Sequence, residues 1–452
     1  MISPSLSSDA LAPVVAQLAA ENRAFMEIYP GETDRRQAVH TVYGGAHLFK
    51  AGSTAKLGEV ALRSLEEFAP DPARLTGILC KSWTPEFADK LYARVIGKLR
   101  SEPVEDFRLD FEDGYGNRVD DEEDGHAVSS AVEVAAGLAA GTLPPFIGIR
   151  IKPFNEDLRD RSIRTLDLFI STLVRETGGK LPPNFVVTLP KVQLAAHVAA
   201  AAAILDMLEE KVGLPAGSIP IEPMIETPQS IIDRHGNCPL LAMVRAAGGR
   251  CRSVHFGVYD YTASSGITAA YQAMGHPACD FARSHMIVAL AGTGVHLSDG
   301  ATNILPVAPH RGDSLTEDQI AKNFAAVHGA WKMAYDDNLH SLENGIYQGW
   351  DLHPAQLVAR YAAVYSFFLQ GLEAASGRLK AFVEKAALAS LFGDVFDDAA
   401  TGQGLLNFFL RGIACGAITE AEALETGLTL EEIRSRSFYK ILTGRRDRVG
   451  SL

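Results

Sequence analysis

The segments that decide the fold are Ile-Glu-Pro-Met-Ile-Glu-Thr at residues 221–227 and Phe-Gly-Val-Tyr-Asp-Tyr at residues 256–261. Each segment begins with a short apolar run, which is typical of a buried strand, and each carries a carboxylate just after that run. The two carboxylates, Glu226 and Asp260, are separated by about one strand–helix unit of chain. The spacing therefore predicts that they lie at the ends of neighbouring parallel strands.

The same alternation continues on both sides of these segments. Strands are predicted at Val39–Tyr43, Phe107–Phe111, Phe146–Ile151, Phe185–Leu189, Ile219–Met224, Ser253–Val258, Val295–Ser298 and Ile346–Leu352. Most of the intervening stretches have room for a helix, so the strands should be parallel with right-handed crossovers. Eight such units predict a TIM-type (β/α)8 barrel. Leu75–Cys80 also has the pattern of a strand, and we interpret it as an insertion between the first two barrel strands.

Helical patterns flank the predicted barrel. Residues 8–28 alternate with a helical period, and Asp9 is a candidate cap. After Val358 the strands stop and helical patterns continue to the end. The sequence therefore predicts an N-terminal helical segment at residues 1–37, a barrel at 38–357 and a C-terminal helical domain at 358–452.

Composition excludes several classes of protein. The chain has 452 residues and 47% hydrophobic residues, enough for a large core, and its formal net charge of −13 argues against nucleic acid as a partner. The five cysteines are scattered without a CxxC pair, which indicates reduced thiols. There is neither a signal-peptide pattern nor an uninterrupted apolar stretch of about 18 residues, so we expect no membrane contact and a cytoplasmic protein.

Polar residues stand at most of the predicted strand ends, where the chemistry of a parallel barrel is found. They are Asp110, Glu112 and Asp113, Arg150, Lys191, Glu226, Asp260, Asp299, and His353. Taken singly, each could be a helix cap, a surface charge or an ion-pair partner. Two carboxylates in one mouth repel each other unless a cation or proton intervenes. Mg²⁺, with Mn²⁺ as an alternative, prefers such oxygen ligands.

Two other patterns have ordinary interpretations. The run Asp120–Asp124 is predicted to be a solvated loop or a helix start. His40, His47, His255, His285 and His296 show no metal-binding spacing and are predicted to be core or surface residues. A P-loop, a dinucleotide fingerprint and a hydrolase nucleophile elbow are not found in the sequence.

In their order along residues 38–358, these motifs resemble a superfamily of enzymes. It includes the citrate lyase β subunit, malyl-CoA lyase, the HpcH/HpaI aldolases and malate synthase. The motifs are Tyr43-Gly44-Gly45, Asp110-Phe111-Glu112-Asp113, Ile149-Arg150-Ile151-Lys152, Leu189-Pro190-Lys191, Pro223–Thr227, Phe256–Tyr261, Asp299-Gly300 and Gly349–Gln356. Lys152 and Gln193 depart from the family pattern, which leaves the substrate open.

The resemblance implies a carbon–carbon bond lyase or synthase that acts through an enolate on a 2-oxo acid or a 3-hydroxyacyl-CoA-type substrate. It implies Glu226 and Asp260 as Mg²⁺ ligands, and Arg150 as the catalytic residue that holds the substrate oxyanion. Gly44 and Lys191 would also bind substrate. Glu112 would have a catalytic role, and Glu112 or Asp113 would hold water that is bound to the metal. The partners would be a small carboxylate, with or without acyl-CoA, and further copies of the chain in a homo-oligomer.

A separate stretch, Phe396–Thr401, resembles the M-E-D-A-A-T segment of malate synthases. In that family the Asp before the two alanines removes a methyl proton from acetyl-CoA, which points to Asp398 as the general base. The residues that follow, Gly402-Gln403-Gly404, depart from the malate synthase pattern, and an acidic helix start is the ordinary alternative.

Two alternatives to this function remain open. The first is a CoA-independent pyruvate aldolase, in which Asp398 would be incidental. The second is a catalytically silent barrel that serves as a binding or scaffold protein. The sequence also leaves open the acceptor, the acyl donor and the direction of the reaction.

Overall fold

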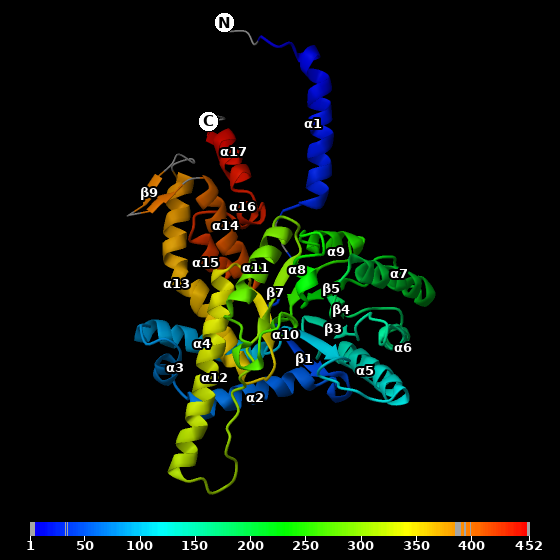
Figure 1. Ribbon diagram of the computed structural model, residues 1–452. Helices are drawn as coiled ribbons and strands as arrows, with labels where there is room; N and C mark the ends of the chain where they lie inside the picture. The colour runs from blue at the N-terminus through cyan, green and yellow to red at the C-terminus, as the bar shows by residue number, and fades with distance from the viewer. Residues whose placement is uncertain are drawn as a thin grey trace.

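A computed structural model describes residues 5–31, 33, 35–384, 390–392, 395–397 and 399–449 of the protein. Its centre is a closed barrel of parallel strands in the order β1-β2-β3-β4-β5-β6-β7-β8 (Figure 1). The strands are β1 (His40–Gly45), β2 (Asp106–Asp110), β3 (Phe146–Arg150), β4 (Phe185–Leu189), β5 (Ile221–Ile225), β6 (Ser253–Phe256), β7 (His296–Ala301) and β8 (Gln348–Asp351). The predicted TIM-type fold is confirmed.

The strand register brings the predicted site residues together. On the β2–β3 pair, Asp110 lies opposite Arg150. The barrel closes where β1 pairs with β8, with Val42 opposite Asp351. The limits of β4 match the prediction, whereas most other strands are displaced from the predicted limits by one to a few residues.

Helices surround the barrel, and they fill the predicted spaces between strands (Figure 1). They are α2 (Ser53–Phe68), α4 (Pro85–Ser101), α5 (Asp120–Ala140), α6 (Arg159–Glu176), α7 (Ala195–Val212), α9 (Leu240–Ala246), α11 (Pro277–Leu290), α12 (Glu317–Glu343) and α13 (Gln356–Glu384). Short helical turns, including η1 (Ala46–Leu48), α8 (Pro228–Ile231) and α10 (Val258–Ser264), follow β1, β5 and β6.

The acidic run at residues 120–124 begins α5, where carboxylates are favoured by the helix dipole. One member is not solvated. Glu123 is fully buried, accepts a hydrogen bond from Thr165 Oγ1 at 2.6 Å, and lies 2.9 Å from Lys152 Nζ. The prediction of a helix start was therefore right, and the prediction of solvation was wrong for this residue.

The predicted strand at Leu75–Cys80 is instead most of a helix, α3 (Pro72–Leu79). The Asp71 side chain caps the helix by accepting a hydrogen bond from the Arg74 N–H at 2.8 Å. Leu75 and Leu79, four residues apart, are the buried residues of α3, as helical spacing requires. A short apolar run does not distinguish a buried strand from a helix, which explains the error.

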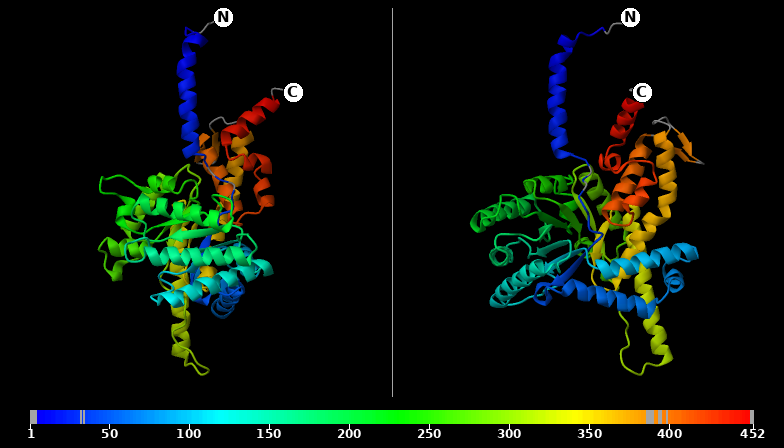
Figure 2. Two further views of the ribbon diagram at one scale, coloured as in Figure 1. Left: turned by 90° about the vertical axis from the view of Figure 1, so that its right-hand side faces the viewer. Right: turned by 180° about the vertical axis from the view of Figure 1, so that it is seen from behind.

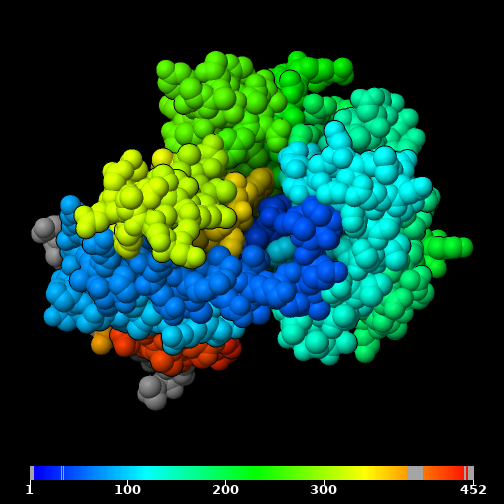
Figure 3. Space-filling view, turned by 90° about the horizontal axis from the view of Figure 1, so that it is seen from below, coloured from blue at the N-terminus to red at the C-terminus, as the bar shows by residue number. Residues whose placement is uncertain are grey.

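The N-terminal helix α1 (Ser8–Ile28) extends away from the barrel, and none of its residues is buried (Figures 1 and 2). Its cap is Ser7, whose side chain accepts a hydrogen bond from the Ala10 N–H, and not Asp9 as predicted. The chain reaches β1 at the end of the barrel nearest α1. The strands finish at the opposite end, which is hollowed in the view from below (Figure 3).

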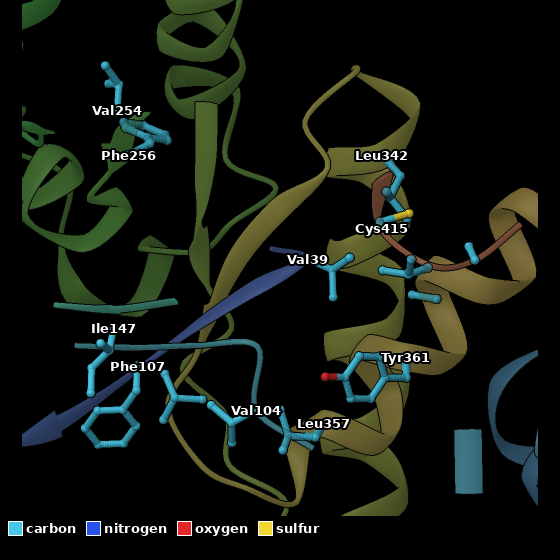
Figure 4. Packing of buried hydrophobic residues seen from close by; sticks show 14 of the residues in the cluster. Val39, Val104, Phe107, Ile147, Val254, Phe256, Leu342, Leu357, Tyr361 and Cys415 are labelled. Carbon is cyan, nitrogen blue, oxygen red and sulfur yellow. The ribbon is translucent and has the colours of Figure 1, made fainter. Parts of the chain in front are cut away.

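Helix α13 begins at Gln356, a short turn after β8 ends at Asp351, and passes through the predicted domain boundary at residues 357/358 without interruption. Helices α14 (Ala399–Ala414), α15 (Glu420–Leu424), α16 (Leu430–Arg434) and α17 (Phe438–Val449) follow it. Val39 of the barrel, Tyr361 of α13 and Cys415 belong to one continuous hydrophobic cluster (Figure 4). The C-terminal helices therefore share their core with the barrel.

All five cysteines are free thiols. Within the described residues, none of the helices combines the length and the apolar character needed to cross a membrane.

Candidate active site

The candidate site lies at the mouth of the barrel, where the strands end. Arg150 is the last residue of β3, Lys191 follows β4, and Glu226 follows β5. Asp260 lies in the first turn of α10, which follows β6 directly. Glu112 and Asp113 follow β2, so residues from five neighbouring strand ends meet here.

Arg150 is held by a carboxylate that the sequence analysis did not single out for a role. Its Nε donates to Asp110 Oδ1 at 2.6 Å, and its Nη2 donates to Asp110 Oδ2. Asp110 also accepts hydrogen bonds from the N–H groups of Glu112 and Gly114, at 3.0 and 2.7 Å. Burial raises the pKa of Asp110, but Arg150 and these hydrogen bonds outweigh it, so the pKa lies below its usual range.

The remaining contacts of Arg150 leave one nitrogen facing the acidic side of the mouth. The guanidinium carbon lies 4.8 Å from the centre of the Tyr43 ring, within the range of a cation–π contact. Nη1 lies 3.1 Å from Glu112 Oε2 and 3.7 Å from Asp113 Oδ2. Arg150 is thus a buried, fixed cation that presents Nη1 to the site.

Lys191 connects the two proposed metal ligands. Its backbone N–H donates to Glu226 Oε1 at 2.6 Å, and its Nζ lies 3.5 Å from Asp260 Oδ2. The same Nζ pairs with Glu112 and lies 3.4 Å from Asp113 Oδ2. The backbone φ of Lys191 is 50°, a left-handed conformation that is unfavourable for a residue with a side chain. Such strain is often found at functional sites, because the surroundings must impose it.

Glu226 is almost completely buried, whereas the Asp260 side chain is 41% exposed. Burial has the largest effect on the pKa of Glu226, and it raises that pKa. The Asp260 and Glu112 carboxylates raise it further and Lys191 lowers it, so that the pKa of Glu226 is about 8. Gly257 makes room for this side chain, because a Cβ at that position would lie 2.3 Å from Glu226 Oε2.

The site has more negative than positive groups. Its cations are Arg150 and Lys191, and its carboxylates are Asp110, Glu112, Asp113, Glu226 and Asp260. Among the described residues, no group of three or more His, Cys, Asp or Glu side chains has a geometry that could hold a metal ion. A metal here would therefore depend on one or two carboxylates and on its substrate, which is the usual situation for Mg²⁺.

Not every predicted residue lies in this cluster. A Cβ on Gly44 would lie 2.7 Å from the Phe107 ring, so Gly44 faces that ring, whereas Gly45 faces the backbone oxygen of Gly114. Asp299 is buried and engaged by Arg283 at 2.8 Å and Ser341 at 2.6 Å.

Asp398 lies outside the residues that the structure describes. The described strands before it, β9 (Ser390–Phe392) and β10 (Val395–Asp397), form a hairpin. The hairpin follows the far end of α13, and Figures 1 and 2 show it at the end of the molecule from which α1 extends. This end is opposite to the mouth.

Buried and partly buried polar side chains continue from Arg150 toward the inside of the barrel, beginning with Tyr43, whose ring Arg150 contacts. Tyr43 Oη lies 3.0 Å from His255 Nδ1, and the Trp350 indole N–H donates to the same nitrogen at 3.0 Å. Because an indole N–H can only donate, Nδ1 must accept, and the proton of a neutral His255 is on Nε2. That nitrogen lies 2.9 Å from Glu222 Oε2. Of the two predicted locations for His255, the core is therefore correct.

Glu222 is also part of an ion-pair network. Arg108 donates to Glu222 Oε2 at 3.0 Å and also pairs with Asp106. Thr188 Oγ1 donates to Glu222 Oε1 at 2.8 Å. The sequence analysis missed this network because it is built from the inward-facing residues of several strands. The alternation of Asp106 with Arg108 on β2 was the available signal.

Two solved structures are reported as similar to the chain. A citrate lyase from Burkholderia xenovorans LB400 is 17% identical, with a TM-score of 0.54 over 86% of this chain and 96% of that chain. A magnesium and glyoxylate complex of Haloferax volcanii malate synthase is 15% identical, with a TM-score of 0.45 over 90% of this chain and 99% of that one. At these identities, the likeness to the citrate lyase establishes the fold alone.

No curated protein sequence matches the chain. One family model does, and its match extends over residues 18–441, which is most of the sequence. The chain therefore belongs to the family described as a domain of unknown function, DUF6986.

Proposed function

We propose that the barrel mouth is the active site of a Mg²⁺-dependent lyase or synthase. It would make or break a carbon–carbon bond next to the carboxylate of a 2-oxo acid or in a 3-hydroxyacyl-CoA-type substrate. The observation that carries the proposal is the convergence on Lys191, whose backbone N–H binds Glu226 and whose Nζ lies beside Asp260 and Glu112. Arg150 Nη1 lies 3.1 Å from Oε2 of the same Glu112 carboxylate, whose Oε1 pairs with Lys191.

Glu226 and Asp260 are the residues that would hold the metal. Their donor atoms are oxygens, which suit Mg²⁺ and also Mn²⁺. The fit is supported by the space left at Gly257 beside Glu226 Oε2, and by the excess of carboxylates over cations in the mouth. When bound, the ion would supply Lewis acidity toward the substrate's carboxylate and neighbouring oxygen.

Arg150 would stabilise negative charge that develops on the substrate oxygen. Its orientation is fixed in advance by Asp110 on one side and by the Tyr43 ring on the other. A cation held in place before the reaction stabilises a transition state more effectively than one that must be reorganised. Lys191 would bind the substrate carboxylate at the rim. Glu112 or Asp113, both beside Lys191, would hold water next to the metal ligands.

Asp398 is the proposed base for an acyl-CoA reaction. A thioester methyl group is a very weak acid, so its proton must be removed by a group within hydrogen-bond reach. The neighbouring β9–β10 hairpin is at the opposite end of the molecule from the mouth. We therefore propose that Asp398 acts on the mouth of another copy of the chain, in a homo-oligomer.

The test is a substrate screen on the purified protein with Mg²⁺. Glyoxylate, oxaloacetate and longer 2-oxo acids are each offered with and without acetyl-CoA, and products with a new or broken carbon–carbon bond are detected by mass spectrometry. Glu226→Gln should abolish turnover, and Glu210→Gln, an exposed change on α7, should not. Turnover of pyruvate without CoA would assign the aldolase activity instead. Mg²⁺ binding without any turnover would indicate a binding protein.

A further inference from the structure

A cavity of about 350 Å³ lies at the end of the barrel opposite the mouth. Its lining includes the first residues of several strands, Asp106, Phe146, Phe185, Ser253, His296 and Gln348. Its volume is within the range of small-molecule sites. This end of a TIM barrel ordinarily contributes to stability and not to binding, so a cavity here that is lined by charged and apolar residues requires an explanation.

The charges of the cavity are divided between floor and rim. On the floor, the carboxylates of Asp106 and Glu222 are both engaged by Arg108, and all three side chains are buried. Arg108 offsets one of the two negative charges, and Thr41 and Thr188 donate hydrogen bonds to Asp106 and Glu222, so both carboxylates already have partners within the barrel.

The rim carries arginines. Arg36 is paired with Glu102 and with Glu105, the latter at 3.3 Å. Arg252 also lines the cavity, at the residue before β6. Throughout the part of the chain that the structure describes, we find no ion pair or side-chain hydrogen bond made by the Arg252 guanidinium. Its fork is therefore available to an anion, and a guanidinium matches the two oxygens of a carboxylate.

One wall of the cavity is apolar. Leu181, Pro182 and Phe146 lie there, and Val186 of β4 adds a further aliphatic surface. Such a wall does not stabilise a bound inorganic anion, but it does stabilise a hydrocarbon group that is removed from water. The combination of a free guanidinium and an apolar wall is suited to a molecule that has both an anionic group and an apolar part.

We propose that this cavity binds a small organic carboxylate, with its carboxylate on Arg252 and its apolar body against Phe146 and Leu181. The site is separate from the barrel mouth, and the inference does not depend on the proposed function.

The experiment uses the full-length protein and isothermal titration calorimetry with three probes. Phenylacetate represents the proposed ligand, 2-phenylethylamine has the opposite charge on a similar body, and inorganic phosphate is an anion without an apolar part. Phenylacetate should bind, and the other two should not compete with it. Arg252→Ala should weaken phenylacetate binding by about tenfold or more, as expected for the loss of a charge-assisted pair.

Arg245→Ala is the matched control, because Arg245 is an exposed arginine of α9 that does not line the cavity. It should leave binding unchanged. Arg252→Lys retains the charge without the fork and should bind with intermediate affinity. The proposal is overturned if phenylacetate does not bind at millimolar concentration, or if Arg252→Ala and Arg245→Ala bind it equally. Equal binding of phosphate would also overturn it, because the apolar wall would then have no role.

Discussion

Asp110 and Arg150 face each other across the β2–β3 pair, with Arg150 Nε 2.6 Å from Asp110 Oδ1 and both side chains buried. The pair turns a flexible cation into a fixed one at the point where two strands end. Because both side chains are buried, the loss of one charge leaves the other with weaker partners, which for Arg150 are Glu112 and Asp113 at the mouth.

We expect Asp110→Asn to lower the free energy of unfolding by about 3–5 kcal/mol, the usual cost of breaking a buried ion pair. Urea denaturation followed by circular dichroism measures this change. The matched control is Asp336→Asn, which removes an exposed i,i+4 partner of Lys332 and should cost less than about 1 kcal/mol. Equal effects of the two substitutions would show that the Asp110–Arg150 pair is not important for stability.

Arg150→Lys tests the chemical role of the guanidinium. Lysine retains the charge but cannot bind both oxygens of Asp110 while presenting a further N–H group to the mouth. We expect kcat/KM to fall by about 100-fold or more, similar to the loss of an oxyanion donor. Steady-state kinetics on the substrate found in the screen measures the effect. A near-normal kcat/KM would mean that Arg150 has a structural role only.

Glu226 should make stability depend on pH in the metal-free protein. Its pKa in the folded state is about 8 against a usual value of 4.5, so the folded state retains a proton that the unfolded state releases. The stabilisation is complete below about pH 4.5 and is lost as the pH rises toward 8. The slope approaches about 1.4 kcal/mol per pH unit.

Denaturant unfolding at several pH values measures this slope, and Glu226→Gln should flatten it over the same window. Added Mg²⁺ should oppose the loss of stability at high pH, because the metal binds the deprotonated carboxylate. An unchanged slope in the Gln variant would refute the assignment of the titration to Glu226.

The barrel could be predicted from sequence because strand–helix alternation is a local pattern. The prediction was wrong at α3, where Leu75 and Leu79 fit either a helix or a short buried strand. Only the packing of that segment beside α4 resolves the ambiguity, and this packing is a tertiary effect. The predicted cap of α1 was wrong for a related reason. Ser7 and Asp9 are both good capping residues, and the sequence alone does not decide between them.

The candidate site could be predicted only as well as the ends of the strands could be predicted. Lys191 does lie beside both Glu226 and Asp260. The direction in which a side chain points was harder to predict, because it changes when the strand register shifts by one residue. Gly44 and Gly45 illustrate this, because they face opposite sides of β1. The Asp110–Arg150 pair depends in addition on which strands are neighbours, and this information is not local.

Asp398→Asn distinguishes an acyl-CoA reaction from a pyruvate aldolase. The variant should still bind Mg²⁺ and the 2-oxo acid, because those contacts are made at the mouth. It should lose deuterium exchange at the acetyl methyl group and lose condensation, because no base remains to remove the proton. Methyl exchange followed by NMR measures the first loss. Wild-type turnover in this variant would contradict the role of Asp398 and support the CoA-independent alternative.

A mixing experiment tests whether Asp398 serves the mouth of another copy of the chain. Asp398→Asn and Glu226→Gln should each be inactive alone, because one lacks the base and the other lacks a metal ligand. If the site is shared between copies, a mixed oligomer contains mouths with an intact Glu226 beside an intact Asp398 from the neighbouring copy. Co-refolded or co-expressed mixtures should therefore regain activity, measured against each variant treated alone.

A mixture of Asp398→Asn with Asp398→Ala is the control and should stay inactive. If the first mixture also stays inactive although mixed oligomers form, each base must act on its own mouth, and the β9–β10 hairpin would have to move to the opposite end of the barrel.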